Sequence, residues 1–218
     1  AILEYDQSNN SSQIILADTP QTYSGYEPFL NFTGKQITGI NIVDNFLFWS
    51  DGDNEPKKIN ISRSFHTNGN LAIDDPNLSP AYLHIDGQLT DVLLNEEHIT
   101  VIKKKPTSAP TVKLISAKGE AGSAIFEKVF IRFCTRYKYA DGEYSAFGPF
   151  TDVVFNPEHN ELINSANAYS TDEPYNKSMV NLIKSVELYD FISPDMPADV
   201  VQVDILYKQE DSTAVYSI

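Results

Sequence analysis

Hydrophobic residues recur at every second position along most of the chain, in short runs that turn dipeptides separate. The stretch QITGINIVDNFLFWSDG predicts a strand over residues 37–42, a tight turn at Asp44-Asn45 and a second strand over residues 46–49. Asparagine and aspartate suit a two-residue turn because both tolerate a positive φ. The pattern therefore predicts a β-hairpin here.

The same period of two continues on both sides of residue 105. KKINISRSF, AYLHIDG, TDVLLN and HITVIKKK predict strands in the first half, with a turn at Gly87. In the second half, VFIRFCTRYKY predicts a long strand, Asp141-Gly142 a turn before an aromatic return, and LIKSVELYDF and VVQVDILYKQEDSTAVYSI three more strands. Only residues 160–169 show a marginal helical pattern. The predicted fold class is all-β.

The segment KKKPTSAPTVKL predicts a boundary near residue 105, because its two prolines keep the chain extended and donate no ladder hydrogen bonds. Residues 1–105 form one predicted β region, and residues 106–218 carry the strands of a small β-sandwich. The run Lys103–Lys105 is interpreted as a solvated strand end. Residues 156–177 form a long polar loop, typical of a functional or interfacial segment. DSTAVYSI ends on an alternating strand, which suggests a piece of a longer polypeptide.

The charge of the chain argues against a protein that binds nucleic acid specifically. The formal net charge is −14, and residues 1–105 and 106–218 each sum to −7. Affinity for a phosphate backbone rests on clustered lysine and arginine, which neither half offers. The single cysteine, Cys134, excludes an internal disulfide and is interpreted as a small residue on a strand face. No run of 18 apolar residues predicts a membrane span, and AILEYDQSNN does not resemble a leader.

Candidate metal and catalytic patterns are weak. DGDNE resembles the start of a calcium loop at Asp51, Asp53 and Glu55, but the sixth position is Pro56 and the twelfth is Ser62. A turn held by aspartate side chains is therefore the preferred interpretation. The four histidines form no metal-binding spacing and are interpreted as surface or edge residues; they are His66, His84, His98 and His159.

No enzyme signature emerges from the remaining motifs. Ser123 lacks the glycine two residues before it that a nucleophile elbow uses, and no βαβ unit surrounds GEAG at Gly119–Gly122. Asp74-Asp75 and Glu96-Glu97 could serve a glycosidase only if folding brought two carboxyl groups into one cleft; solvated loops are preferred. We expect neither an enzyme nor a cofactor.

Aromatic residues are numerous, with 12 Tyr, 12 Phe and one Trp. Tyrosines beside asparagine and serine are typical of contact surfaces; those in predicted loops or strand ends are Tyr23, Tyr26, Tyr144, Tyr169 and Tyr175. An alternative function is therefore a bacterial surface or secreted module that binds glycans or proteins. In that alternative, Trp49 would be the platform on which a sugar stacks.

The first hairpin resembles a blade hairpin of YWTD-type β-propellers, in which an aromatic-Trp-Ser-Asp run ends one strand and a basic-apolar strand follows. In FLFWSDGDNEPKKINIS, period two places Leu47 and Trp49 on one face, where Ile59 and Ile61 would pair back. Only one such unit is visible, so this chain alone cannot close a propeller. The residues expected to matter structurally here are Trp49, Asp51, Pro56, Ile59 and Ile61.

The order of motifs resembles the muzzle, nozzle or stabilization tail proteins of crAss-like and podovirus-type phages. It runs from LFWSDGDNEPKKINI through EHITVIKKKPTSAPTVKL to VFIRFCTRYKYADGEYSAFGPF and VDILYKQEDST, over residues 37–218. The resemblance implies propeller-like β structure over residues 1–105 and a fibronectin- or immunoglobulin-like sandwich over 106–218. It implies no catalytic residues. The sandwich residues expected to matter are Tyr137, Tyr139, Gly142, Tyr144 and Phe147, with Gly142 at a positive φ.

The resemblance also implies a place and partners. We expect a virion component at the distal end of a short tail, in a homo-oligomeric ring of six copies that contacts other tail proteins. DNA would pass such a ring only transiently, and an acidic wall would repel it.

Overall fold

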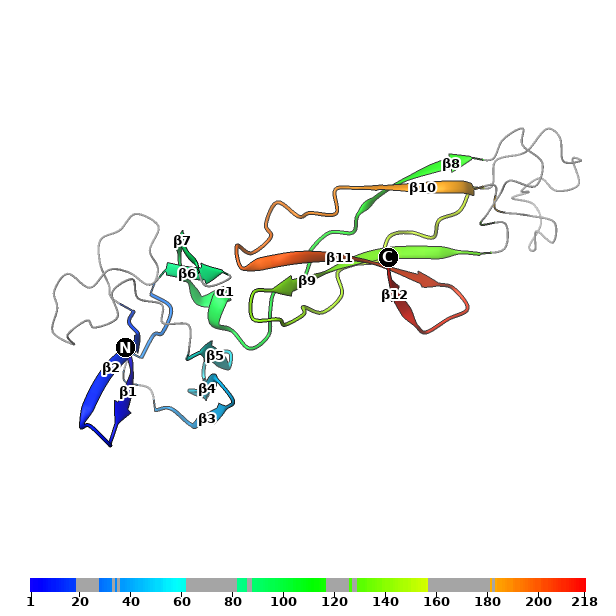
Figure 1. The fold of residues 1–218 in the computed structure, drawn as a ribbon. Helices are drawn as coiled ribbons and strands as arrows, with labels where there is room; N and C mark the ends of the chain where they lie inside the picture. Colours follow the sequence, from blue (N-terminus) through cyan, green and yellow to red (C-terminus); the bar gives the residue numbers. More distant parts are fainter. Residues whose placement is uncertain are drawn as a thin grey trace, which may run out of the picture. The chain divides into compact units, whose positions relative to one another are not determined.

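The computed structural model describes residues 1–18, 28–32, 34, 36–61, 82–85, 88–116, 126, 129–156, 181 and 183–218. Over these residues the chain forms twelve strands and one four-residue helix (Figure 1). The prediction of an all-β class is therefore confirmed at that level. The chain divides into two compact units: unit 1 comprises Ala1–Lys104, Tyr139–Glu143 and Pro197–Val201, and unit 2 comprises Lys105–Lys138, Tyr144–Met196 and Gln202–Ile218.

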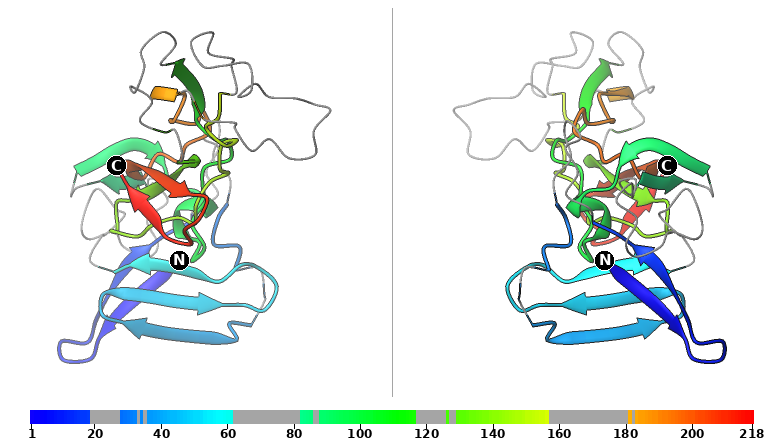
Figure 2. Two further views of the ribbon diagram at one scale, coloured as in Figure 1. Left: turned by 90° about the vertical axis from the view of Figure 1, so that its right-hand side faces the viewer. Right: turned by 90° about the vertical axis from the view of Figure 1, so that its left-hand side faces the viewer.

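The described residues of unit 1 form three small antiparallel sheets. Its elements are β1 (Ile2–Asp6), β2 (Ser11–Leu16), β3 (Gly39–Val43), β4 (Phe46–Ser50), β5 (Lys57–Asn60), β6 (Tyr82–Ile85), β7 (Gln88–Leu93) and α1 (Glu96–Ile99). Strands β1 and β2 form one hairpin, β3-β4-β5 a three-stranded sheet (Figure 2), and β6 and β7 another hairpin. The β1–β2 hairpin was not predicted, although Asn10 at the end of its turn has a positive φ of 56°.

The predicted turn at Asp44-Asn45 is confirmed. Asp44 has a φ of 52°, and Val43 pairs with Phe46 across the turn. Leu47 then pairs with Ile59 in the neighbouring strand. Because paired residues in an antiparallel sheet point to the same face, the register sends these two side chains to one side.

The predicted strand over HITVIKKK is wrong: α1 forms at its start, and of residues 98–105 only Thr100 pairs, through an isolated bridge to Lys57. The backbone N–H of Asn95 donates to Nδ1 of His98 over 3.1 Å, and the N–H of His98 donates to the Asn95 carbonyl over 3.2 Å. Thr100 Oγ1 then donates to the Glu97 carbonyl over 3.2 Å. Polar side chains that bond the local backbone compete with a sheet ladder, so the chain turns here.

Unit 2 is built mostly from two sheets. Its strands are β8 (Thr111–Ser116), β9 (Ile131–Tyr139), β10 (Ile183–Tyr189), β11 (Val200–Gln209) and β12 (Val215–Ser217), and the ends of β9 and β11 lie in unit 1. One sheet has the order β10-β8 and the other the order β12-β11-β9. No sheet closes on itself among the strands that the structure describes.

The segment that follows the Asp141-Gly142 turn returns along β9 without becoming a regular strand. The backbone N–H groups of Ser145, Gly148, Thr151 and Val154 donate to alternate carbonyls of β9, each over 2.8–2.9 Å. Three residues of the return therefore span two residues of β9, and these four residues are the buried ones. The predicted aromatic return exists, but its period is three rather than two.

Hydroxyl groups complete this pairing. In a ladder, a backbone carbonyl would accept from each inward N–H of β9. Here Ser145 Oγ accepts from the Tyr137 N–H over 3.0 Å, and Thr151 Oγ1 accepts from the Phe133 N–H over 3.0 Å. Asn181, fully buried, donates to the Val154 carbonyl over 2.9 Å and accepts from the Asn156 N–H over 3.0 Å. Side chains thus satisfy backbone groups that an irregular segment would leave unpaired.

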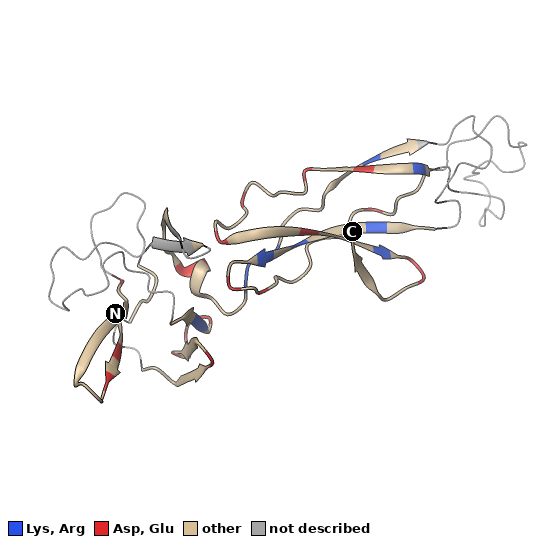
Figure 3. Cartoon of the chain, viewed as in Figure 1, with Lys and Arg blue, Asp and Glu red and all other residues tan. Residues whose placement is uncertain are grey.

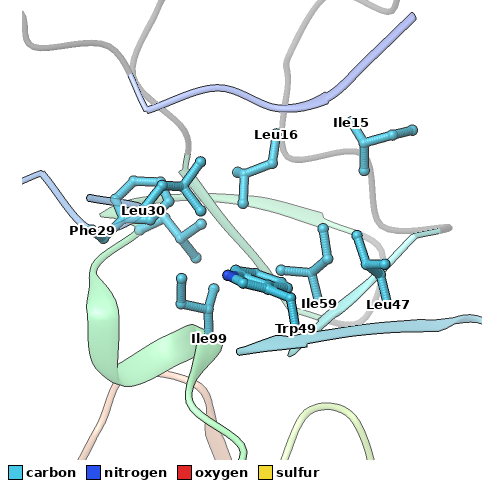
Figure 4. Close-up of a cluster of buried hydrophobic side chains, with 9 residues drawn as sticks. Ile15, Leu16, Phe29, Leu30, Leu47, Trp49, Ile59 and Ile99 are labelled. Atoms are coloured by element: carbon cyan, nitrogen blue, oxygen red, sulfur yellow. The ribbon is translucent and has the colours of Figure 1, made fainter. Parts of the chain in front are cut away.

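Each unit has its own hydrophobic cluster. The cluster of unit 1 joins side chains from β2, β4, β5 and α1 with residues between them (Figure 4): Ile15, Leu16, Phe29, Leu30, Leu47, Trp49, Ile59, Leu94 and Ile99. The cluster of unit 2 centres on Ile131, Phe133, Val154 and Ile183. Partly buried Val112 of β8 and Val186 of β10 pack against it, so both sheets of unit 2 contribute to this cluster.

Several predictions fall outside the described residues. These concern the Gly87 turn residue, His66, His159, the Asp74-Asp75 pair, GEAG at Gly119–Gly122, Ser123, the helical pattern over 160–169, most of the loop over 156–177, and Tyr23, Tyr26, Tyr169 and Tyr175.

Candidate functional site

The structure brings the apolar residues of the first hairpin together. Trp49 is 6% exposed and lies in the cluster with Leu47 and Ile59, and Ile61 packs against that cluster. In Figure 4 the indole lies between Ile59 and Ile99. A buried ring offers no face on which a sugar could stack. Trp49 therefore cannot be the sugar platform that the glycan-binding alternative requires.

Asp51 holds the turn after β4. Its Oδ1 accepts from the backbone N–H of Asp53 over 3.0 Å and of Asn54 over 2.8 Å, and its Oδ2 accepts from the Asn54 amide over 2.7 Å. This is the turn held by aspartate that the sequence favours over a calcium loop. Pro56 follows, exposed on its side chain, and its carbonyl accepts from the Val101 N–H over 2.9 Å. The described residues hold no group of three or more possible metal ligands.

A group of buried lysines in unit 1 is a further feature that the sequence did not reveal. Lys57, Lys58 and Lys103 are all buried. Lys57 pairs with Glu96, Lys58 with Glu143, and Lys103 Nζ lies 3.3 Å from Asp199 Oδ2. Burial lowers the pKa of Lys58 most, and the Lys103 charge lowers it further. The interpretation of Lys103 as a solvated strand end is wrong, because tertiary contacts supply its counter-ion.

Lys103 makes the most contacts of these three lysines. Its ammonium donates to the His98 carbonyl over 2.7 Å and lies 5.1 Å from the centre of the Tyr139 ring. The Tyr139 hydroxyl donates to the Lys104 carbonyl. The carboxylate, the carbonyl and the ring face all stabilise this buried ammonium group.

His98 is buried, so its interpretation as a surface or edge residue is wrong. Nδ1 accepts from the Asn95 N–H, which leaves the proton of the neutral ring on Nε2. Nε2 has no hydrogen-bond partner among the described residues, and neither has Oδ1 of Asp199. Burial lowers the pKa of His98; Asp199 and Glu97 act in the opposite direction.

The five sandwich residues fall into two groups. Tyr137 and Tyr139 are each 1% exposed, whereas Tyr144 and Phe147 are exposed. Gly142 has a φ of 81°, as predicted, but it lies in unit 1 with Tyr139 rather than in the second unit. The Arg136 guanidinium lies 4.1 Å from the centre of the Tyr144 ring. One face of this exposed ring is therefore covered by Arg136.

An uncovered apolar strand face lies at β3. Ile40 and Ile42 pair with Trp49 and Leu47 and so point to the face of the core. They are nevertheless 71% and 59% exposed, because the residues that cover Trp49 and Leu47 do not extend over β3. β3 is also an edge strand. Alternation predicted the strand, but sequence alone could not show that it would stay uncovered.

Other chemistry is scarce within the described part of the chain. Cys134 is fully buried, and burial raises its pKa to about 11, so its thiol is a poor nucleophile. No described helix has the length and apolar character that a bilayer crossing requires. Fold and contacts together define a β-rich protein of two units with uncovered apolar surface. Comparison with family models, with curated proteins and with solved structures finds no match.

Proposed function

We propose that the chain is a structural subunit of a tailed-phage virion, part of the tail muzzle or nozzle that forms the conduit for genome ejection. The order of motifs over residues 37–218 motivates this assignment. It makes the chain a non-enzymatic assembly protein without a cofactor, which contacts other tail proteins and copies of itself in a ring.

The uncovered face of β3 is the observation that carries the proposal. An apolar strand at the edge of a sheet promotes association between chains. Ile40 and Ile42 extend the buried face of β4 beyond its cover, as an incomplete layer would. In a virion, an adjoining tail protein would complete that layer. A protein that works alone gains nothing from leaving it open.

The surface charge of unit 1 suits a conduit. Three of its described lysines are buried in ion pairs, which removes their charge from the surface. Its exposed acidic residues include Glu4, Asp6, Asp44, Asp53, Glu55, Glu96 and Glu97. An acidic wall repels DNA and lets it slide past without binding.

We also propose a propeller-like fold for the first β region and a fibronectin-like sandwich for the second. The β3-β4-β5 sheet has the antiparallel order of propeller blade strands. The sheets β10-β8 and β12-β11-β9 both contribute side chains to one hydrophobic cluster, as the layers of a fibronectin-like sandwich do.

Immunogold electron microscopy on phage particles tests the location. Antibodies raised against the chain should place gold at the tail tip. Gold on the bacterial envelope, with clean particles, would overturn the proposal and favour a surface-binding module.

A further inference from the structure

Two cations face each other across strands β9 and β11. The strands are antiparallel: the Glu210 N–H donates to the Phe130 carbonyl over 2.9 Å, and Arg136 Nη2 lies 2.9 Å from Asp204 Oδ2. Residue 130 therefore lies opposite residue 210, and residue 136 lies opposite residue 204. In this register Arg132 lies opposite Lys208, and the two side chains point to the same face of the sheet. Both strands carry basic residues in Figure 3.

This pairing is unusual among the described strands of unit 2. Lys113 of β8 lies opposite Glu187 of β10 and pairs with it over 2.9 Å, and Arg136 has Asp204. The side chains of Arg132 and Lys208 make no hydrogen bond or ion pair with the residues that the structure describes. Like charges directly opposite each other destabilise a sheet, and the chain has 30 acidic residues against 16 basic ones. An anion between the two would remove the repulsion.

The space for such an anion exists. Arg132 and Lys208 line a cavity of about 300 Å³ with Phe150, Gln209 and Glu210. The half-buried Phe150 gives it an apolar wall, and Gln209 offers an amide. Glu210 leaves a net charge of one positive unit, which suits a single carboxylate better than a doubly charged phosphate. Arginine binds a carboxylate through two parallel hydrogen bonds.

We propose that Arg132, Lys208 and Phe150 form a carboxylate-binding pocket that receives an acidic side chain of a second copy of this chain. Charge complementarity supports this occupant, because the exposed surface of the chain is rich in Asp and Glu. The pocket and its acid are different parts of the molecule, so the contact is head-to-tail, the kind that closes rings. The inference rests on the proposed ring and supplies one of its contacts.

Sedimentation velocity on the 218-residue chain tests the pocket. In about 20 mM salt, where surface charges are little screened, the chain should self-associate, and about 0.5 M salt should weaken this. The double variant Arg132→Gln/Lys208→Gln should weaken association at least about tenfold. The control Lys105→Gln/Lys113→Gln removes the same charge from exposed lysines and should stay within about twofold of the wild type. Phe150→Leu should weaken association by less than the double variant.

Three results would overturn the inference. The first is a wild-type chain that stays monomeric at low salt. The second is a double variant that associates like the control while retaining its circular dichroism. The third is binding of a duplex or single-stranded oligonucleotide that depends on Arg132 and Lys208 while association does not; DNA would then be the occupant. These measurements use the isolated chain, so they can fail while the immunogold location holds, and the reverse.

Discussion

Gly142 shows how one residue limits a turn. Its φ of 81° lies in the left-handed region, and a Cβ there would meet no atom within 4 Å. Any cost of substitution therefore comes from the backbone, about 1–2 kcal/mol for most residues and more for a β-branched one.

We expect Gly142→Val to lower the free energy of unfolding by about 2 kcal/mol, measured by chemical denaturation. Gly142→Asn is the control, because asparagine tolerates a positive φ, and it should cost clearly less. Equal stability of the valine variant and the wild type would contradict the turn geometry.

His98 should make stability depend on pH. Its folded pKa is lowered from 6.5 by burial, so the unfolded chain binds a proton more readily than the folded chain. Its contribution is intact above pH 6.5 and is lost as the pH falls through the folded pKa. His98→Gln keeps an acceptor but does not titrate.

Thermal unfolding from about pH 8 to about pH 5 checks this expectation. The wild type should lose more stability below pH 6.5 than His98→Gln does. Parallel curves for the two proteins would show that His98 is not buried as the structure has it.

At the scale of elements, the return along β9 depends on close packing at Gly148. A Cβ on Gly148 would lie 2.8 Å from Pro106 Cβ and 3.2 Å from the Thr135 carbonyl oxygen. Both neighbours are rigid, and overpacking of this kind typically costs about 1–3 kcal/mol.

Gly148→Ala should therefore lower the free energy of unfolding by about 1–3 kcal/mol, which shifts the urea midpoint to a lower concentration. Gly39→Ala is the matched control, since its Cβ would meet only the Ser50 hydroxyl within 4 Å, at 3.1 Å. If both variants unfold at the wild-type midpoint, the three-residue period is not the packing in solution.

The elements divide into those the sequence could predict and those it could not. Asp44-Asn45 and Asp141-Gly142 are local turn signals, and alternation identified β4, β9 and β11. Helix α1 was not predicted, because it depends on hydrogen bonds between the His98 and Thr100 side chains and the nearby backbone rather than on the spacing of hydrophobic residues. The return along β9 could not be predicted, because its pairing uses the hydroxyl groups of Ser145 and Thr151. A search for alternating hydrophobic residues does not detect such pairing.

At the scale of the whole molecule, unit 1 is completed by residues from the second half of the sequence. Lys103 and Asp199 are separated by 96 positions, and Lys58 pairs with Glu143. No local pattern could predict these pairs, and the sequence boundary at residue 105 separates both. Cutting the chain there would leave two buried lysines without their carboxylates.

Asp199→Asn should consequently lower stability by about 3–5 kcal/mol, because it leaves the buried Lys103 ammonium without its counter-ion. Glu187→Gln breaks the exposed pair with Lys113 and should leave the melting temperature unchanged. Calorimetry on both variants checks the contrast. Similar melting temperatures for the two would mean that Lys103 is solvated.

The uncovered face of β3 underlies the proposed role in a virion, and a cysteine at Ile40 tests it most directly. The native Cys134 is buried with a raised pKa, so a maleimide should react with the introduced thiol alone. Ile40→Cys should label rapidly in the isolated chain and be protected in phage particles that carry the variant. Thr213→Cys, in an exposed turn, should label in both. Equal labelling of Ile40→Cys in the two states, or particles that lack the chain, would contradict the account.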